Sequence, residues 1–199
     1  MERRTKKDQK IDAILLSTIQ LLAERGYADT NIADIASHAN VYKSLLHYYF
    51  KDKEDLVSKA LALRSNSMIQ PTKEALFGVG SLEELVDGAI FFLKRDIEQN
   101  PDFFALIFET WCTGRRSVRI KQEFNAGINQ RKDDIKDVLE DAANRRLIRL
   151  EDQVQLEGLA HIILALYHGL ALQLIHNPDI STNDKVWFLL KKMLLAGLS

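Results

Sequence analysis

The sequence predicts an all-α protein with a small N-terminal and a larger C-terminal helical domain. Apolar residues recur at helical spacing in one segment after another, and no strand-like alternation appears along the chain. The 199 residues contain 9 Gly and 3 Pro, and the long stretches that carry neither favour helices over hairpins. A chain of this length suits one or two domains and is long enough to bury a substantial core.

The first predicted helix spans roughly residues 6–25. Its apolar stripe consists of Ile11, Ile14, Leu15, Thr18 and Leu22. Gly26 ends the helix, because glycine adopts the left-handed conformation after a helix without strain. The start of the chain is basic, since residues 1–10 hold five Lys and Arg against two acids. Such an arm either attracts polyanions or is a solvated, disordered tail, and composition leaves both interpretations open.

A short second helix follows, with Thr30 or Asn31 as its N-cap. Its inner face consists of Ile32, Ile35, Ala36 and Ala39. Asn40 tolerates a positive φ and therefore suits a tight turn. A third helix is expected to begin near Tyr42, and a fourth near Asp52, whose side chain can cap it.

The third helix contains the segment VYKSLLHYYF, residues 41–50, which is rich in aromatic and polar side chains. Helical periodicity places Leu46, Tyr49 and Phe50 on a core-facing side. The opposite side presents Lys43, Ser44, His47 and Tyr48. Their polar groups can all hydrogen-bond to phosphate oxygens or base edges. A short helix, a turn of about four residues and a second helix with such a face are typical of a DNA-binding helix-turn-helix.

Several residues between positions 26 and 56 agree in type and spacing with a known family. They are Gly26, Tyr27, Thr30, Asp34, Ile35, Ala36, Ala39, Val41, Lys43, Leu46, Tyr49, Phe50, Lys53, Glu54 and Leu56. Through them the run GYADTNIADIASHANVYKSLLHYYFKDKEDL resembles the DNA-binding domain of the tetracycline-repressor (TetR) family of bacterial regulators. The resemblance is close over about residues 8–60. The remainder is similar only in general plan, to C-terminal domains of the betaine-regulator type.

The predicted DNA-contacting residues are Thr30, Tyr42, Lys43, Ser44, Leu45, His47, Tyr48 and Lys53. The resemblance implies a phosphate contact for Thr30 and places the start of the third, recognition helix in the major groove. It also implies a backbone grip by His47 and Tyr48. Lys53 falls at the N-terminus of the fourth helix, where free N–H groups also favour a phosphate.

The sequence departs from the family pattern around the recognition helix. Asn40 and Ser44 replace common glycines, and His47 replaces a tyrosine. Leu45 replaces a small hydroxyl residue, so it cannot donate to a phosphate but can meet a thymine methyl. We therefore expect an unusual DNA site. A helix-turn-helix that no longer binds DNA is the alternative.

Three further helices are predicted in the C-terminal domain. One stripe, ending before Asn100 and Pro101, consists of Leu82, Leu85, Val86, Ala89, Ile90, Leu93 and Ile97. The next, ending at Gly114, consists of Phe103, Phe104, Ile107, Phe108 and Trp111. A long helix from about 117 to 144 is marked by Ile120, Phe124, Ile128, Ile135, Val138, Leu139 and Ala142.

Residues 158–178 contain no Asp, Glu, Lys or Arg. About 20 apolar residues span a bilayer, but the histidines, amides and glycines of this window argue against a membrane helix. A helix that is apolar all round is otherwise buried on all sides. We therefore expect one face to meet its own domain and the other a second subunit. Together with another apolar helix at 184–198, two copies would form a four-helix dimer interface.

The family binds small effectors inside this domain, and the resemblance implies the same here. The predicted ligand-contacting residues are Phe92, Asp96, Phe104, Phe108, Trp111, Phe124 and Arg131. Asp96 and Arg131 interrupt apolar stripes, where a charge needs a partner, a ligand or an escape to water. The alternatives are an aromatic core without a cavity, and an Asp96–Arg131 ion pair or a side chain that reaches water. Glu109 lies opposite its aromatic stripe and is expected in solvent.

The remaining candidates for chemistry are weak. Cys112, the single cysteine, is either a redox sensor or an ordinary buried thiol. His161 and His168 lie about 10 Å apart along one helix face and cannot chelate one ion. No metal cluster, nucleophile elbow or phosphate loop appears, so neither a metal, a cofactor nor an enzymatic activity is expected. With no signal-peptide-like segment behind the basic start, we expect a cytoplasmic location.

Residues and resemblance together predict a homodimeric transcription regulator. A helix-turn-helix DNA-binding domain is expected over residues 1–52, and a helical effector-binding and dimerisation domain over 53–199. The partner is double-stranded operator DNA, from which a small-molecule effector would release the protein as a repressor. The alternative is a helical ligand- or protein-binding module whose DNA-binding head is vestigial.

Overall fold

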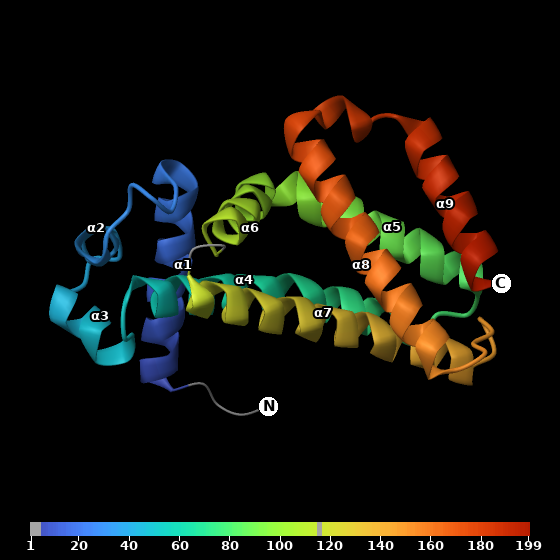
Figure 1. The fold of residues 1–199 in the computed structure, drawn as a ribbon, viewed down its shortest axis with the longest axis horizontal. Helices are drawn as coiled ribbons and strands as arrows, with labels where there is room; N and C mark the ends of the chain where they lie inside the picture. Colours follow the sequence, from blue (N-terminus) through green and yellow to red (C-terminus); the bar gives the residue numbers. More distant parts are fainter. Residues whose placement is uncertain (1–4, 115–116) are drawn as a thin grey trace. The chain divides into compact units, whose positions relative to one another are not determined.

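The computed structural model describes residues 5–114 and 117–199, and the regular elements of these residues are all helices (Figure 1). They are α1 Lys6–Arg25, α2 Ile32–His38, α3 Lys43–Tyr49, α4 Lys53–Leu76, α5 Leu82–Gln99, α6 Pro101–Gly114, α7 Val118–Asn144, α8 Gln153–His176, the 3-10 helix η1 Pro178–Ile180, and α9 Asp184–Leu198. The predicted all-α class is confirmed.

The chain packs into two compact units. Unit 1 combines the chain up to Ser67 with Ala105–Gly127, and unit 2 combines Met68–Phe104 with Ile128–Ser199. The chain passes from one unit to the other within α4, α6 and α7. The predicted division into residues 1–52 and 53–199 follows the motif rather than the packing, and it stays a prediction.

Unit 1 begins with α1, which has the predicted bounds. Its first turn is closed by a reciprocal cap, in which the Thr5 hydroxyl accepts from the Asp8 N–H at 3.2 Å and the Asp8 carboxylate accepts from the Thr5 N–H at 2.9 Å. Gly26 ends α1 at φ 80°, as expected. α1 packs on α2, and α2 on α3. The buried core is Ile14, Leu15, Ile19, Leu21, Leu22, Ile35, Ala36, Leu46, Phe50, Leu56, Val57, Ala60 and Leu106.

The turn between α2 and α3 is held by local hydrogen bonds. Asn31, rather than Thr30, caps α2, because its side chain accepts from two N–H groups of the first turn at 2.8 and 3.1 Å. Asn40 adopts φ 51°, which confirms the predicted positive φ. The next N–H, of Val41, donates to the Ala36 carbonyl at 2.9 Å. These contacts fix the angle at which α3 leaves α2.

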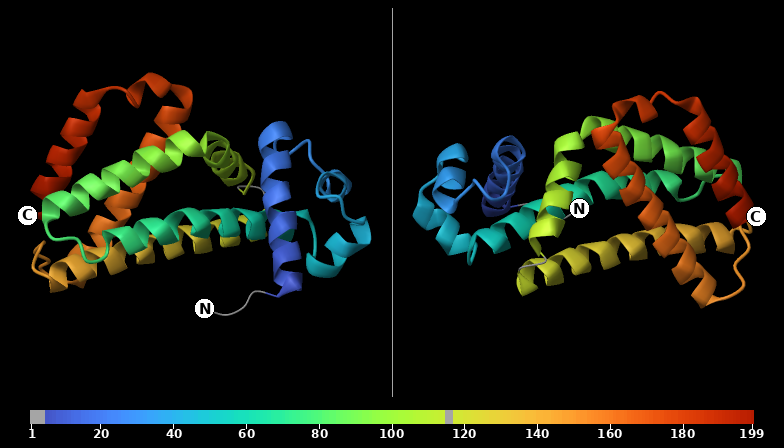
Figure 2. Two further views of the ribbon diagram at one scale, coloured as in Figure 1. Left: turned by 180° about the vertical axis from the view of Figure 1, so that it is seen from behind. Right: turned by 45° about the horizontal axis from the view of Figure 1, so that its top comes forward.

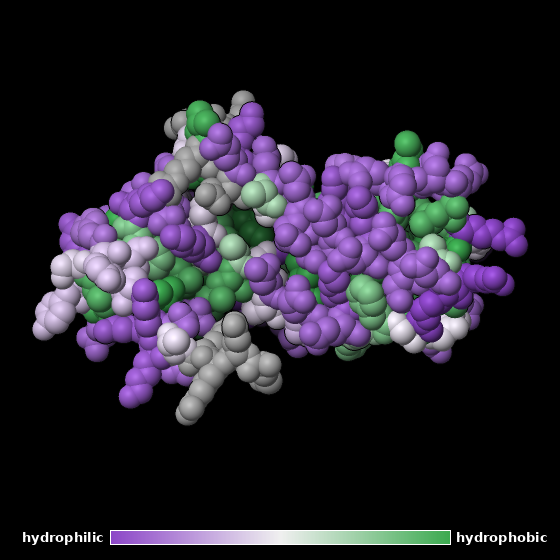
Figure 3. All heavy atoms as spheres, turned by 90° about the horizontal axis from the view of Figure 1, so that it is seen from below, coloured by the Kyte–Doolittle hydropathy of each residue, from purple (hydrophilic) through white to green (hydrophobic). Residues whose placement is uncertain are grey.

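Unit 2 contains α5, α8 and α9 together with the C-terminal parts of α4 and α7. α5 packs against both α8 and α9, an arrangement that can be followed from two further sides in Figure 2. The buried core is Leu76, Leu85, Val86, Leu139, Ala142, Ile148, Leu156 and Leu198. The side of unit 2 on which α7 lies is mostly hydrophilic, as the purple area on the right of Figure 3 shows.

α4 is one continuous helix although Pro71 lies inside it. Proline has no N–H, so the carbonyl of Ser67, four residues earlier, loses its helical hydrogen-bond partner. Ser67 is also the residue at which the chain leaves unit 1. The hydrogen-bond ladder of α4 is therefore interrupted where the chain passes from unit 1 to unit 2.

α8 is the one helix, among the described residues, that is long and apolar enough to cross a membrane by length and composition; 22% of its most apolar window is buried within the chain. Together α8 and α9 leave large apolar side chains in solvent. We call them the exposed α8–α9 residues: Val154, Ile162, Leu172, Phe188, Leu189 and Met193. The chain by itself does not cover these residues.

Candidate DNA-binding surface and effector pocket

The polar side of α3 and the residue before it are presented to solvent. We call these residues the α3 face: Tyr42, Lys43, Ser44, His47 and Tyr48, all exposed. Tyr42 and Tyr48 expose 86% and 76% of their surface, whereas Leu46 and Phe50 on the opposite side expose 1% and 3%. The predicted division of residues 41–50 into a core side and an exposed side is confirmed.

The α3 face combines an ammonium, an imidazole and three hydroxyl groups. Each of these can hydrogen-bond to a phosphate oxygen or a base edge. The Tyr48 ring packs against the Tyr49 ring in a T-shaped arrangement, with ring centroids 4.9 Å apart. A row of such side chains on α3, the second helix of the helix-turn-helix, fits a major groove.

Two predicted DNA-contacting residues are turned toward the interior of unit 1. Thr30 is 2% exposed, and its hydroxyl donates to the Gly26 carbonyl at 2.8 Å. Because a hydroxyl has one proton, Thr30 cannot at the same time donate to a phosphate. Leu45 is half-buried and packs against the unit 1 core. In this conformation neither residue belongs to the α3 face.

Lys53 also makes its contacts within unit 1. Its ammonium donates to the Tyr27 carbonyl and lies 4.0 Å from the centroid of the Tyr27 ring. Burial lowers the pKa of Lys53, and the negative charge of Glu109 opposes that effect. The N–H of Tyr27 in turn donates to Glu109 at 2.8 Å. The expectation of a solvent position for Glu109 was therefore wrong, because its side of α6 meets the turn after α1.

Further cations lie near the helix-turn-helix. Lys51, which sequence reasoning did not single out, is exposed in the turn directly after α3. Its position next to the recognition helix was the available signal. Lys6, Lys7 and Lys10 are exposed at the start of α1, so this part of the predicted basic arm is helical. The first residues of the arm, 1–4, lie outside the described residues.

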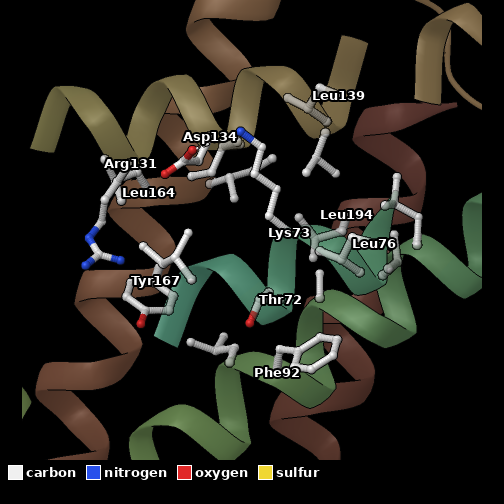
Figure 4. Close-up of a pocket in the computed structure, with 18 of the residues that line it drawn as sticks. Thr72, Lys73, Leu76, Phe92, Arg131, Asp134, Leu139, Leu164, Tyr167 and Leu194 are labelled. Carbon is white, nitrogen blue, oxygen red and sulfur yellow. Dashed lines mark hydrogen bonds and ion pairs between the residues drawn. The ribbon is translucent and has the colours of Figure 1, made fainter. Parts of the chain in front are cut away.

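Unit 2 contains a cavity of about 180 Å³ between α4, α5, α7, α8 and α9 (Figure 4). Three of the predicted ligand-contacting residues, Phe92, Asp96 and Arg131, line it. Most of the remaining lining residues are Leu, Ile and Val. The cavity is therefore apolar with a few charged groups, a composition typical of small-molecule sites.

Charged and polar groups gather on one side of this cavity. Asp96 accepts from the Arg95 guanidinium at 2.9 and 2.6 Å, and Asp134 accepts from the Lys73 ammonium at 3.0 Å. Arg131 and Tyr167 interact with each other, which opposes the effect of burial on the pKa of both groups, and Figure 4 shows their side chains at the same end of the cavity. Asp96 is 5% exposed, so it does not escape to water.

The other predicted ligand-contacting residues do not line this cavity. Phe104 is 1% exposed and packs 5.7 Å from the Tyr167 ring, centroid to centroid. Phe108, Trp111 and Phe124 belong to unit 1, where Trp111 stacks on Phe124 with centroids 6.2 Å apart. Phe92 is thus the one predicted aromatic residue that lines the cavity.

The histidines and the cysteine are not arranged for metal chemistry. Among residues 5–114 and 117–199, no group of three or more His, Cys, Asp or Glu could hold a metal ion. Burial, and then the charge of Arg131, lowers the pKa of His168 to about 4. Cys112 is exposed, which excludes the expected buried thiol.

Comparison with known proteins agrees with the helix-turn-helix. A family model described as "Bacterial regulatory proteins, tetR family" matches residues 14–60. The transcriptional activator FasR of Mycolicibacterium smegmatis is 24% identical over 106 residues, which are 53% of this chain and 48% of FasR. The chain thus matches about half the length of this curated relative.

Solved structures extend the likeness to the whole chain. Salmonella enterica GusR superposes with a TM-score of 0.80 at 21% identity, over 99% of both chains. FadR from Bacillus subtilis, solved in complex with stearoyl-CoA, gives 0.72 at 16% identity, over 94% of this chain and 98% of that one. The fold is shared along the chain, and the family match lies on the helix-turn-helix. Residues 14–60 therefore match the TetR family of bacterial regulatory proteins, and the whole chain shares the fold of these solved structures.

Proposed function

We propose that the protein is a cytoplasmic transcription regulator that binds double-stranded operator DNA as a homodimer. The observation that carries the proposal is the α3 face, whose five hydrogen-bonding side chains are exposed while the opposite side of α3 is buried. Each subunit would place this face in a major groove. The helix-turn-helix domains of the two subunits, about 34 Å apart, would contact successive turns of the duplex.

The second subunit would cover the exposed α8–α9 residues. Soluble monomers rarely expose large apolar patches, and apolar helices of two copies can form a four-helix interface. The polar residues of α8 argue for a protein partner rather than a lipid environment. The proposal includes no catalytic activity, because the sequence carries none of the nucleophile or phosphate-loop motifs of common enzymes.

A small molecule in the unit 2 cavity is the proposed effector, and its binding would release DNA, so the protein would act as a repressor. The effector would stabilise a conformation whose heads no longer match the operator spacing. FadR, similar in fold, was solved with stearoyl-CoA, which supports a ligand-binding role for this type of domain. FasR is named an activator, so an operator-linked reporter must decide between repression and activation.

The DNA-binding proposal is tested with Lys43→Ala and Tyr48→Ala. Both side chains point into solvent, so both variants should keep the wild-type circular dichroism and melting temperature. Operator affinity should fall about tenfold or more, since one good contact contributes about 1–3 kcal/mol. Fluorescence anisotropy with DNA from the chain's own upstream region measures the affinity, with Arg149→Ala, at an exposed arginine between α7 and α8, as the control.

Salt dependence completes the test. If the Lys43 ammonium neutralises a phosphate, Lys43→Ala should reduce the slope of log affinity against log salt by about one. Wild-type affinity in both variants, or binding that does not respond to salt, would favour the alternative of a ligand-binding module with a vestigial head.

A further inference from the structure

We propose that the unit 2 cavity binds a linear, apolar monoanion such as a medium-chain carboxylate, with its head at Arg131 and Tyr167. This inference rests on the proposed function, since it names the chemical class of the effector for the same cavity. The hydrocarbon chain of the ligand would lie along the apolar part of the cavity, toward Leu139 and Leu198. The shape, the apolar lining and the charge of the cavity each support one part of this assignment.

The apolar part of the cavity calls for an apolar body. Away from Arg131 the lining includes Leu76, Leu85, Leu139 and Leu198, all of which also belong to the buried core of unit 2. Figure 4 shows Leu76, Leu139 and Leu194 on the side away from Arg131 and Tyr167. A polar ligand group there would lose its water without finding a hydrogen-bond partner. Hydrocarbon is the chemistry that this part of the lining accepts.

The cavity is long compared with a compact ligand. On α7 the lining runs from Arg131 to Leu139, a rise of about 12 Å at 1.5 Å per residue. On α5 it runs from Asp96 to Leu85, about 16 Å by the same measure. The charged residues Arg131 and Asp96 lie at one end of both stretches, and leucines lie at the other. This gradient along two helices fits a ligand with one polar end and a flexible apolar chain.

Arg131 supplies the donors for the polar head. A guanidinium has five N–H donors in a planar fork that matches a carboxylate. Tyr167, at the same end of the cavity, has a pKa that burial raises to about 12. The phenol therefore stays neutral and adds a hydroxyl donor to the same end of the cavity. Arg131 and Tyr167 together can bind both oxygens of a carboxylate.

The charges around Arg131 favour an anion over a cation. The two nearby carboxylates, Asp96 and Asp134, raise the pKa of Arg131 against the effect of burial. Asp96 also accepts from Arg95, and Asp134 shares the Lys73 ammonium with Asp137. The positive charge of Arg131 is also felt on α8, where it adds to burial in lowering the pKa of His168. A carboxylate head would offset this positive charge. An ammonium head would add to it.

The test compares three ligands that differ only in their heads: decanoate, decanol and decylamine. Isothermal titration of the full-length protein, below the concentrations at which these compounds aggregate, measures affinity. Wild type should bind decanoate at least about tenfold more tightly than decanol, because a charge-assisted hydrogen bond contributes more than a neutral one. Decylamine should bind most weakly of the three. Tighter binding of decanol or decylamine than of decanoate would overturn the proposal.

Two variants test the residues. Arg131→Met should lose the preference for decanoate but keep its affinity for decanol, and Tyr167→Phe, which keeps the ring, should show a smaller loss of the same kind. Arg149→Met, which removes an exposed arginine, is the matched control. If either variant weakened all three ligands equally, the residues would only support the fold, and the assignment of the head would be wrong.

A thioester and the readout on DNA separate the remaining outcomes. Binding of decanoyl-CoA without binding of decanoate would overturn the carboxylate head. Release of operator DNA by decanoate, followed by anisotropy, should be lost in Arg131→Met while operator binding itself remains. If decanoate does not bind but operator binding is intact, the inference fails and the proposed DNA function stands.

Discussion

Burial sets the protonation state of His168, a residue that the sequence marked only as one of two histidines on a helix face. Its pKa is lowered to about 4, first by burial and then by the charge of Arg131. In an unfolded chain the pKa of histidine is about 6.5. The unfolded state therefore takes up a proton more readily. The contribution of His168 to the free energy of unfolding is fully present above about pH 6.5 and is lost as the pH falls toward about 4.

We expect this residue to make the free energy of unfolding about 2 kcal/mol smaller at pH 5 than at pH 7. His168→Gln should remove that part of the pH dependence. Urea denaturation at both pH values measures it, and His161→Gln, exposed on the same helix, should behave as wild type. A pH dependence in His168→Gln equal to that of wild type would contradict the assignment.

Residue type and residue partner were predictable to different degrees. The sequence correctly placed Lys43, His47 and Tyr48 on an exposed side, because the direction of a side chain on a helix follows from its number. It did not reveal that Lys53 bonds to Tyr27 or that Glu109 accepts from the same residue. These interactions join segments far apart in the chain. The periodicity of one helix shows which way a side chain points but not which distant residue it contacts.

The helices themselves were predictable because their signals are local. α1, α5 and α9 lie where their stripes and caps put them, and the expected capping role of Asp52 for α4 is confirmed by its acceptance of the Asp55 N–H at 2.8 Å. The lining of the cavity was harder to foresee. It depends on which stripe faces which other helix, so Phe92 lies in it while the aromatic residues of α6 do not.

A glycine sets how closely α5 approaches α4. A Cβ built on Gly88 would lie 2.8 Å from a methyl group of Leu76, and Leu76 lines the cavity. Gly158, on α8, has nothing within 4 Å of the same position. The two glycines thus form a matched pair, one at a close approach between helices and one in open space.

Gly88→Ala should move the Leu76 side chain and narrow the cavity. We expect affinity for decanol to fall about tenfold, whereas the free energy of unfolding should change by less than about 2 kcal/mol, as the gain in helix propensity offsets part of the crowding. Titration and urea denaturation measure the two quantities. Gly158→Ala should gain about 1 kcal/mol and bind decanol as wild type does. Unchanged decanol affinity in Gly88→Ala would show that Leu76 moves away from the cavity instead.

At the scale of the whole molecule, the exposed α8–α9 residues determine the state of assembly that we propose. Phe188, Leu189 and Met193 expose 62%, 56% and 63% of their surface, although each belongs to a residue type that is usually buried. The sequence indicated an exposed apolar surface, because an uncharged α8 next to an apolar α9 has more apolar surface than one chain can cover. How the two units share α4, α6 and α7 was not predictable, since a continuous helix gives no local sign of a boundary.

Leu189→Glu should convert a dimer into monomer or aggregate. A carboxylate buried in an apolar interface loses its hydration without gaining a partner, which costs several kcal/mol in each subunit. Sedimentation velocity at micromolar concentration measures the change, and operator affinity should fall with it. Val118→Glu, at an exposed apolar position of α7, is the control. A wild-type protein that sediments as a stable monomer would refute the homodimer.

The proline in α4 has a mechanical consequence. Bending a helix elsewhere stretches or breaks backbone hydrogen bonds, whereas at Pro71 the bond to the Ser67 carbonyl is already missing. Deformation of α4 is therefore cheapest within the one turn that joins these two residues. Ile69, Thr72 and Lys73, close to that turn, line the cavity. A molecule bound against these residues acts on the part of α4 that bends at the lowest cost. Three residues separate the other end of α4, at Lys53, from the recognition helix.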